Sequence, residues 1–393
     1  MVNVHSKQRG AVSIFVVIFA ALLIVMTATA FVRIMLQDQM QATKDDLSRS
    51  ALDSANAGVE DAKRLLVKFN KECVQAAGPN CGTWRNALNG EDCDALHTVL
   101  GLGASGSETA VGSDSSLQQA YTCVTVELDT IDYVGSLAPG VSQFIRLKGV
   151  GDFTQVKIDW YSKDNLQASN VSTIRLDADP ARPDLAARSS WPANTPSVLR
   201  AQFMQFGASY ALSSLDASDP ANDNNASTIF MMPVTDSRLR VPLTTLNFNS
   251  AAYASPLQPV RCYADFTTSS NDPYACSVTI GAGDPDDSAN PSATVRREDA
   301  YLRLNAPYND TTHYRIQLLD ASGGVVRFAG VQPRVDSTGR ANDLFRRIVS
   351  RIEPVGNDFP FVEGALDVTG DLCKAFSVSS TTFTDSTTCP IPR

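Results

Sequence analysis

The stretch AVSIFVVIFAALLIVMTATAFV, residues 11–32, decides the fold, because it runs for 22 residues without a charged side chain. A helix rises about 1.5 Å per residue, so this stretch is about 33 Å long and matches a hydrocarbon core of about 30 Å. A helix bonds its backbone polar groups internally, as lipid requires. The sequence therefore predicts a transmembrane helix over residues 11–32, preceded by a basic leader over residues 1–10.

Charges on the two sides of this helix predict its orientation. Lys7 and Arg9 precede it, whereas Asp38, Asp45 and Asp46 follow it. Cationic residues favour the cytoplasmic side of a membrane. We therefore expect a single-pass protein of the cytoplasmic membrane, with its N-terminus inside and its bulk outside the cytoplasm.

The helical pattern continues over residues 33–70, where there is no proline and Gly58 is the only glycine. Small or apolar residues recur there at gaps of three, four and seven, which is the period of one helix face. They are Leu36, Met40, Leu47, Ala51, Ala55, Gly58, Ala62, Leu65 and Phe69. The sequence predicts one helix that continues outside the membrane and whose small residues Ala55, Gly58 and Ala62 allow another surface to approach closely.

The rest of the chain predicts an α+β protein in which the long helix precedes a large, mostly antiparallel β domain with disulfides. Residues 71–118 contain cysteines and a Gly/Ser-rich stretch, which predicts a loop region. Residues 119–360 contain short runs that alternate apolar and polar residues, as in half-buried strands. Residues 361–393 form a Ser/Thr-rich tail that contains two cysteines.

All cysteines follow the membrane helix, and outside the cytoplasm an even number predicts disulfides. The eight are Cys73, Cys81, Cys93, Cys123, Cys262, Cys276, Cys373 and Cys389. Local pairing predicts Cys262–Cys276 and Cys373–Cys389. The first four pair among themselves in one of three ways, between which the sequence does not choose. No CxxC pair occurs, which argues against a metal site.

Composition and motifs also bear on the function class. The net charge of −9 argues against a nucleic-acid partner. No nucleophile elbow, HExxH or phosphate loop occurs, so no enzyme is predicted. Two acidic loops could bind Ca²⁺, but without the spacing of a calcium loop we favour ordinary turns and expect no cofactor. Their residues are Asp216, Asp219, Asn222, Asp223 and Asn225 in one loop and Asp284, Asp286 and Asp287 in the other.

For three weaker patterns we prefer a structural interpretation to a functional one. The GxGxxG string at Gly101, Gly103 and Gly106 lies in a linker rather than a βαβ unit. The tryptophans predict core packing rather than adhesive anchors. The arginines near the C-terminus predict a strand with solvated charges, with a docking patch as the alternative. These residues are Trp84, Trp160 and Trp191, and Arg340, Arg346, Arg347 and Arg351.

Two motifs carry a family resemblance. The leader ends in Lys7-Gln8-Arg9-Gly10, directly before the apolar stretch, and the segment from Ser54 to Ala62 reads SANAGVEDA. The first resembles the leader of a type IV prepilin, and the second resembles the AxAGxExA helix segment of PilX-like minor pilins. The N-terminal region is thus similar to minor prepilins and pseudopilins.

This resemblance implies cleavage between Gly10 and Ala11 by a prepilin peptidase, with N-methylation of Ala11. It also implies other pilin subunits as partners and a helix whose C-terminal half lies against a β-sheet. Most major pilins have Glu where this chain has Phe15. In the family that carboxylate compensates the α-ammonium of a neighbouring subunit, and an unpaired buried charge is costly. Phe15 therefore favours a tip or priming subunit.

We thus expect a structural minor subunit of a type IV pilus-like or type II secretion-like filament, whose β domain faces outward and binds a surface or a partner. The alternative is a signal-anchored extracytoplasmic adhesin or binding protein that enters no filament. A cleaved secretory signal is a further alternative, because residues 28–30 imitate a small-residue cleavage site.

Overall fold

The computed structural model divides the chain into two compact units. The helix unit comprises Met1–Val126 and Val335–Ser350, and the inserted unit comprises Glu127–Arg334 and Arg351–Arg393. In sequence, the inserted unit interrupts the helix unit. The residues that the structure describes are 9–90, 93–102, 108–111, 118–166, 191, 194–205, 226–235, 245–247, 257–263, 273–281, 300–308 and 312–353.

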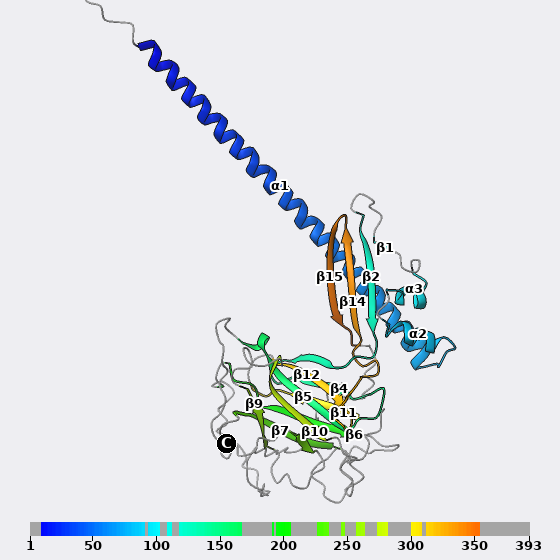
Figure 1. Cartoon of the computed structure of the whole chain (residues 1–393). Coiled ribbons are helices and arrows are strands. Elements are labelled where there is room, and N and C mark those ends of the chain that lie inside the picture. Colours follow the sequence, from blue (N-terminus) through cyan, green and yellow to red (C-terminus); the bar gives the residue numbers. More distant parts are fainter. Residues whose placement is uncertain are drawn as a thin grey trace, which may run out of the picture. The chain divides into compact units, whose positions relative to one another are not determined.

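The helix unit joins one long helix to a four-stranded sheet of order β1-β2-β14-β15 (Figure 1). α1 has 61 residues, and a short π-helical turn, η1, follows it. The elements are α1 (Arg9–Phe69), η1 (Asn70–Val74), α2 (Cys81–Ala87), α3 (Ala95–Leu100), β1 (Thr109–Ala110), β2 (Ala120–Glu127), β14 (Arg334–Ala341) and β15 (Leu344–Arg351). The predicted long N-terminal helix is thus confirmed.

Only the C-terminal half of α1 is packed on this sheet. Ala51, Ala55 and Ala62 have no exposed surface, whereas Leu36 and Met40 are 53% and 57% exposed. The helix face predicted from sequence therefore packs on the sheet from Ala51 onward, whereas its first two members stay exposed. The reason is that periodicity identifies a face but not the length of the surface that covers it.

Two glycines allow α1 and the sheet to come together. A Cβ at Gly58 would lie against the Ser337 hydroxyl and 2.8 Å from a methyl group of Val124. A Cβ at Gly339 on β14 would overlap the backbone of Ala51 and Ala55. β2 and β14 are therefore the surface that closely approaches the helix at Gly58, the position where the sequence predicts such an approach.

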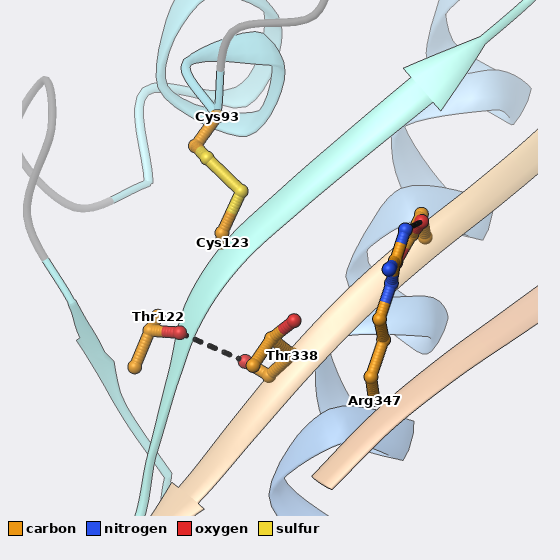
Figure 2. Close-up of a disulfide and its surroundings, with 6 residues drawn as sticks. Cys93, Thr122, Cys123, Thr338 and Arg347 are labelled. Carbon is orange, nitrogen blue, oxygen red and sulfur yellow. Dashed lines mark hydrogen bonds and ion pairs between the residues drawn. A yellow bond between two sulfur atoms is a disulfide. The ribbon is translucent and has the colours of Figure 1, made fainter. Parts of the chain in front are cut away.

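The cysteine-containing region 71–118 is more ordered than the predicted loop, because it includes α2 and α3. Short helices of this kind lack the length over which periodicity is visible. Two disulfides, Cys73–Cys81 and Cys93–Cys123, select one of the three possible connectivities. Figure 2 shows the disulfide that joins Cys93 to Cys123 on β2, near the hydrogen bond that the Thr122 hydroxyl donates to the Thr338 carbonyl on β14, 3.3 Å long.

The inserted unit is a single large sheet whose path runs β13-β12-β5-β10-β9-β7-β6-β11-β4. β3 also pairs with β12, and β8 with β10. Its pairs are antiparallel except β7 with β9 and β8 with β10. The elements are β3 (Tyr133–Leu137), β4 (Ser142–Arg146), β5 (Gln155–Ser162), η2 (Lys163–Asn165), β6 (Leu199–Gln205), β7 (Ala226–Thr235), β8 (Thr245–Asn247), β9 (Leu257–Cys262), β10 (Tyr274–Gly281), β11 (Ala300–Asn305), β12 (Thr312–Leu319) and β13 (Val325–Val326).

The segments that follow β4 and β13, the two ends of this path, are joined by backbone hydrogen bonds around an isolated bridge between Gly149 and Phe328. Val150 N–H donates to the Arg327 carbonyl at 2.9 Å, and Ala329 N–H donates to the Lys148 carbonyl at 2.7 Å. One hydrophobic cluster, which includes Trp160, draws buried residues from β3 to β7 and from β9 to β12. Cys262 pairs with Cys276 across β9 and β10, as local spacing predicts.

A single β domain over residues 119–360 is not what the structure shows, since β2, β14 and β15 belong largely to the helix unit. The sequence places these strands in the β region correctly but gives no sign that their partner is α1. The strands β3, β9 and β14 escape prediction, because turn-like residues interrupt their apolar alternation. The run predicted as a strand at 172–178 and the tail at 361–393, with Cys373 and Cys389, lie outside the described residues.

Candidate functional site

Among the described residues, the N-terminal half of α1 forms the most unusual surface. Its large apolar side chains from Ile14 to Val32 are between 52% and 75% exposed, and Phe15 is the most exposed of them. They lie on all sides of the helix rather than in one stripe, as in a membrane span or a buried assembly helix. Folded monomers rarely expose so large an apolar patch to water. This segment therefore requires a lipid or protein environment.

The polar groups of this segment are satisfied within the helix. The Thr27 hydroxyl donates to the carbonyls of Leu23 and Ile24, at 3.0 and 2.9 Å. The Thr29 hydroxyl bonds in the same way to the carbonyls of Val25 and Met26. Between Ile14 and Val32, no hydroxyl thus has to be transferred into lipid without a partner. Among the described residues, α1 is the one helix that is long and apolar enough to cross a membrane.

The predicted processing residues lie at the very start of α1. Arg9, Gly10 and Ala11 are helical, but the positions of their side chains are not described, and Lys7 lies outside the described residues. Phe15 is in the continuous helix, with its ring 75% exposed. The cleavage site and the role of Phe15 therefore remain predictions from the sequence.

The packed half of α1 is held by polar contacts as well as by small residues. Ser337 on β14 donates a 2.8 Å hydrogen bond to the carbonyl of Ala55. The Tyr121 hydroxyl on β2 donates to the Asp61 carboxylate at 3.0 Å. Burial, together with the charge of Asp61, raises the pKa of Tyr121, so this phenol stays protonated at neutral pH. The Lys68 ammonium donates to the Val99 carbonyl at the end of α3.

The C-terminal arginines all bond within the chain, in agreement with a strand that carries solvated charges. Arg340 pairs with Glu108 at 2.6 Å, and the Arg346 guanidinium donates to the Ser48 hydroxyl on α1. The Arg347 guanidinium donates a hydrogen bond to the Asp336 carboxylate, and this contact raises the pKa of Arg347. These contacts neutralise most of the basic patch, and the surface ones contribute little stability.

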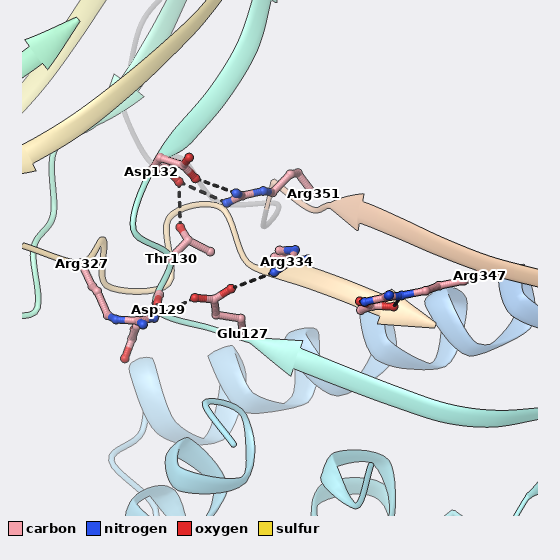
Figure 3. Close-up of polar contacts among 9 residues, drawn as sticks. Glu127, Asp129, Thr130, Asp132, Arg327, Arg334, Arg347 and Arg351 are labelled. Atoms are coloured by element: carbon pink, nitrogen blue, oxygen red, sulfur yellow. Dashed lines mark hydrogen bonds and ion pairs between the residues drawn. The ribbon is translucent and has the colours of Figure 1, made fainter. Parts of the chain in front are cut away.

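Similar ion pairs hold the segments where the chain enters and leaves the inserted unit. Figure 3 shows Arg351 bonded to Asp132 at 2.6 Å, and Glu127 between Arg327 at 2.7 Å and Arg334 at 3.6 Å. The Thr130 hydroxyl donates to the carbonyl of Asp132. Arg351 thus acts as a structural residue of the inserted unit rather than as part of a patch on β15.

The remaining candidates carry no site in the described part of the chain. Trp84 and Trp160 are buried, and Trp191 packs on Tyr308 with ring centroids 4.3 Å apart. Gly101 ends α3 in a left-handed conformation with φ of 71°, a usual role for glycine. The acidic loops at 216–225 and 284–287 and Gly103 and Gly106 lie outside the described residues. Within the described ranges, no three His, Cys, Asp or Glu side chains converge as metal ligands.

Sequence reasoning missed the polar side chains that the strands of the inserted unit bring together. Arg315 on β12 donates two hydrogen bonds to the fully buried Asp159 on β5, at 2.7 and 2.9 Å. Both residues were visible as polar positions within strand-like runs. Their pairing depends on the register between strands that lie 156 positions apart, which a single sequence does not reveal.

Comparisons with known proteins find no family model, no curated protein and no solved structure that matches this chain. Function must therefore be argued from the residues and their geometry.

Proposed function

We propose that this chain is a structural minor subunit of a type IV pilus-like or type II secretion-like filament, in a tip or priming position. Residues 11–32 hold it in the cytoplasmic membrane until its helix is taken up by the filament. The observation that carries the proposal is the division of α1 into an apolar half without a packing partner among the described residues and a half packed on β2 and β14.

The free energy of burying the apolar half supports an environment of lipid or packed helices. Thirteen large apolar side chains between Ile14 and Val32 are more than half exposed. Each contributes roughly 1.5–3 kcal/mol when it is transferred out of water, so the segment gains on the order of 20–40 kcal/mol. A lipid bilayer and the helical core of a filament both supply this environment.

The continuity of α1 supports a role beyond anchoring. A flexible linker would suffice to tether a domain, whereas α1 continues as helix from Arg9 to Phe69. Ala51, Ala55 and Gly58 then fix its second half to the sheet by close backbone contact. Any movement of the apolar half along its axis is thus transmitted to the helix unit. A filament subunit needs this coupling, because the helix packs inside while the rest faces outward.

The decisive test is the N-terminus of the processed protein. The full chain is co-expressed with a prepilin peptidase, and the product is analysed by intact-mass spectrometry and N-terminal sequencing. We expect a product that begins at Ala11 and a loss of processing in the Gly10→Ala variant. Gly82→Ala is a matched control, since a Cβ at Gly82 meets no atom within 4 Å.

The other outcomes of this test select the other functions. Retention of Met1 with the peptidase present supports the signal-anchored extracytoplasmic adhesin or binding protein. The feature of this chain that favours this alternative is Phe15, at the position where most major pilins have Glu. A product that begins near Phe31 supports an ordinary secretory signal. Either result contradicts the filament proposal.

A further inference from the structure

β15 lies at one end of the sheet of the helix unit, beyond β14 (Figure 1). Among the described residues, it pairs with β14 and with no other strand. It has eight residues and contains no proline, whereas β1, at the other end of the sheet, has only two residues. Short edge strands resist pairing with other chains, and long ones without proline invite it. β15 is therefore the long open edge of the described helix unit.

Backbone hydrogen bonds show which residues of β15 face this open edge. The N–H of Ile352, directly after β15, donates to the carbonyl of Pro333, directly before β14, at 2.9 Å. Consecutive residues of a strand direct their N–H and C=O groups to alternate sides. The even-numbered residues of β15 thus bond to β14. Phe345, Arg347 and Val349 direct their N–H and C=O groups to the open edge.

Side-chain contacts agree with this alternation. Arg346 contacts Ser48 on α1, and Arg347, on the other face of the strand, contacts Asp336 on β14. Phe345 and Val349 share the face of Arg347, because side chains alternate along a strand, and they are 55% and 50% exposed. The open edge thus combines a row of backbone donors and acceptors with two exposed apolar side chains.

Arg346 is the charge of β15 that has no carboxylate partner in the described part of the chain. Its guanidinium donates a 2.8 Å hydrogen bond to the neutral Ser48 hydroxyl. Arg347, by contrast, is already paired with Asp336. Opposite charges on directly opposed residues of neighbouring strands attract each other. An acidic side chain opposite Arg346, on a strand added to this edge, therefore complements the charge of the edge.

From this geometry we propose that β15 binds an extended segment of another protein, which joins the sheet as an additional antiparallel strand. The backbone of this segment bonds to Phe345, Arg347 and Val349. It carries apolar residues opposite Phe345 and Val349, and Asp or Glu opposite Arg346. In strand addition, main-chain hydrogen bonds give affinity and alternate side chains give specificity. This inference does not depend on assembly into a filament.

The direction of β15 argues against a second copy of this chain as the partner. Arg346, near the start of β15, contacts Ser48, whereas Ser337, which lies opposite the middle of β15, bonds to Ala55. β15 and α1 therefore run in the same direction. Two copies that paired β15 with β15 in antiparallel fashion would have α1 helices of opposite direction. Helices that enter one membrane from the same side cannot meet this condition.

The test measures binding of a fluorescein-labelled peptide of sequence TVTTEVT to the full chain in detergent micelles, by fluorescence anisotropy. In the antiparallel register, its two valines lie opposite Val349 and Phe345, and its glutamate lies opposite Arg346. We expect saturable binding. N-methylation of both valines removes N–H donors that face β15 and should weaken binding at least tenfold, as loss of hydrogen bonds implies.

A second methylated peptide is the matched control. N-methylation of the glutamate and of the threonine that follows the first valine places two methyl groups on the side away from β15. This peptide should bind within threefold of the unmodified one, because it keeps every donor that faces the edge.

Variants of the full chain test the same edge. Val349→Pro removes an N–H that makes no bond to β14, and edge strands tolerate proline at such positions. We expect this variant to fold and to bind the peptide at least tenfold more weakly. Val349→Thr keeps the N–H and the branched side chain, so its affinity should change less than threefold. Thermal unfolding of each variant verifies the fold, and the methylated peptides decide the question without any change to the protein.

Arg346→Gln tests the acidic residue of the partner. An exposed ion pair contributes little, so affinity for the peptide should decrease about twofold to fivefold. A peptide with glutamine in place of glutamate should show the same loss, without a further loss when both changes are combined. Additive losses would contradict the position assigned to the acidic side chain.

Four other outcomes would overturn the proposal. The first is no saturable binding by the wild type, as expected if the arginines of β15 only keep other strands away. The second is equal affinity of the two methylated peptides, and the third is unchanged affinity of folded Val349→Pro. The fourth is a wild-type dimer that Val349→Pro dissociates, because it would identify a second copy of the chain as the occupant.

Discussion

The Ser337 hydroxyl on β14 donates a 2.8 Å hydrogen bond to the carbonyl oxygen of Ala55 on α1, although the two residues are 282 positions apart. Both are fully buried. The packed half of the helix is therefore completed by a strand that follows the whole inserted unit in sequence. Contacts of such long range form late, because loop closure must precede them. Folding of the helix unit thus depends on residues 335–350.

Gly339 is the position at which this interface should be least tolerant. A Cβ there overlaps the backbone of Ala51 and Ala55, and backbone atoms cannot rotate away. We expect Gly339→Ala to lower the free energy of unfolding by about 1–3 kcal/mol or more, as overpacking does. Urea unfolding followed by circular dichroism measures this loss.

Gly82→Ala is the matched control for Gly339→Ala. Gly82 lies within α2, and a Cβ there meets no atom within 4 Å. Alanine in a helix is more favourable than glycine by roughly 0.5–1 kcal/mol, so this variant should be neutral or more stable. Equal stability of the two variants would contradict the close contact at Gly339.

Gly58 and Ser337 should be energetically coupled. A Cβ at Gly58 lies against the Ser337 hydroxyl and 2.8 Å from a methyl group of Val124. Gly58→Ala alone should be destabilising by about 1–3 kcal/mol, and Ser337→Ala alone by about 1 kcal/mol for the lost hydrogen bond. The double variant should lose less stability than the two single variants together, because the Ser337 hydroxyl that a Cβ at position 58 would meet is then absent. Additive losses in this cycle would mean that the residues do not meet.

The long helix and the β-rich remainder are the parts of the fold that sequence predicts well. A charge-free run of 22 residues and a stripe that continues through Ala55 and Gly58 are local signals, visible without a partner. The Cys262–Cys276 pair is similarly local, since the two residues lie on adjacent strands. The exposed apolar half of α1, the centre of the proposed function, follows from the same local signal.

The division of the β region could not be predicted from the sequence. β2 reads as a half-buried strand whereas β14 does not, and nothing local shows that they pair across the inserted unit. Asp159 and Arg315 are single polar positions in two separate runs, and only the strand register brings them together. Side-chain alternation gives the face of each residue but not its neighbour on the next strand.

The pair Asp159–Arg315 should be important to the stability of the inserted unit. The carboxylate is fully buried and accepts two hydrogen bonds from one guanidinium. Arg315→Met should therefore cost about 3–5 kcal/mol, because among the described residues it leaves the buried charge with Lys157 alone as a cationic neighbour, at 3.5 Å. Replacing both partners, with Asp159→Leu added, should recover part of this loss.

Arg327→Met serves as the comparison for Arg315→Met. Arg327 pairs with Glu127 at 2.7 Å, but its side chain is 49% exposed. Loss of an exposed pair should cost about 1 kcal/mol or less. Urea midpoints of the three variants measure the difference, and similar values for Arg315→Met and Arg327→Met would show that burial of Asp159 has little effect.

The disulfides should differ in their sensitivity to reductant in the folded protein. Cys262 and Cys276 are 2% and 0% exposed, whereas Cys93 is exposed. Thiol–disulfide exchange needs access to a sulfur atom. We expect Cys93–Cys123 to be reduced first and Cys262–Cys276 to resist until the protein unfolds. Alkylation and peptide mass spectrometry after partial reduction measure this order and also test the predicted Cys373–Cys389 pair.

Repeating the reduction in denaturant gives the control for this experiment. Unfolding removes the protection by burial, so all disulfides should then react at similar rates. Persistence of the order in denaturant would show that burial of Cys262–Cys276 is not its cause.

Tyr161 on β5 should make the inserted unit sensitive to alkaline pH. Its ring is 1% exposed, and burial raises the pKa of its phenol from 10.0 to about 12. The folded state therefore keeps a proton that the unfolded state loses above pH 10. Its contribution to stability is fully present below pH 10 and decreases as the pH rises towards 12.

Tyr161→Phe removes this titration but keeps the buried ring. The difference in the free energy of unfolding between wild type and variant should be constant below pH 10 and should shift in favour of the variant between pH 10 and 12. Urea unfolding at a series of pH values measures it. Burial also raises the phenol pKa of Tyr133 and Tyr314, so both proteins lose stability at high pH and only their difference reports on Tyr161. Parallel curves throughout that range would show that Tyr161 ionises as readily in the folded chain as in the unfolded one.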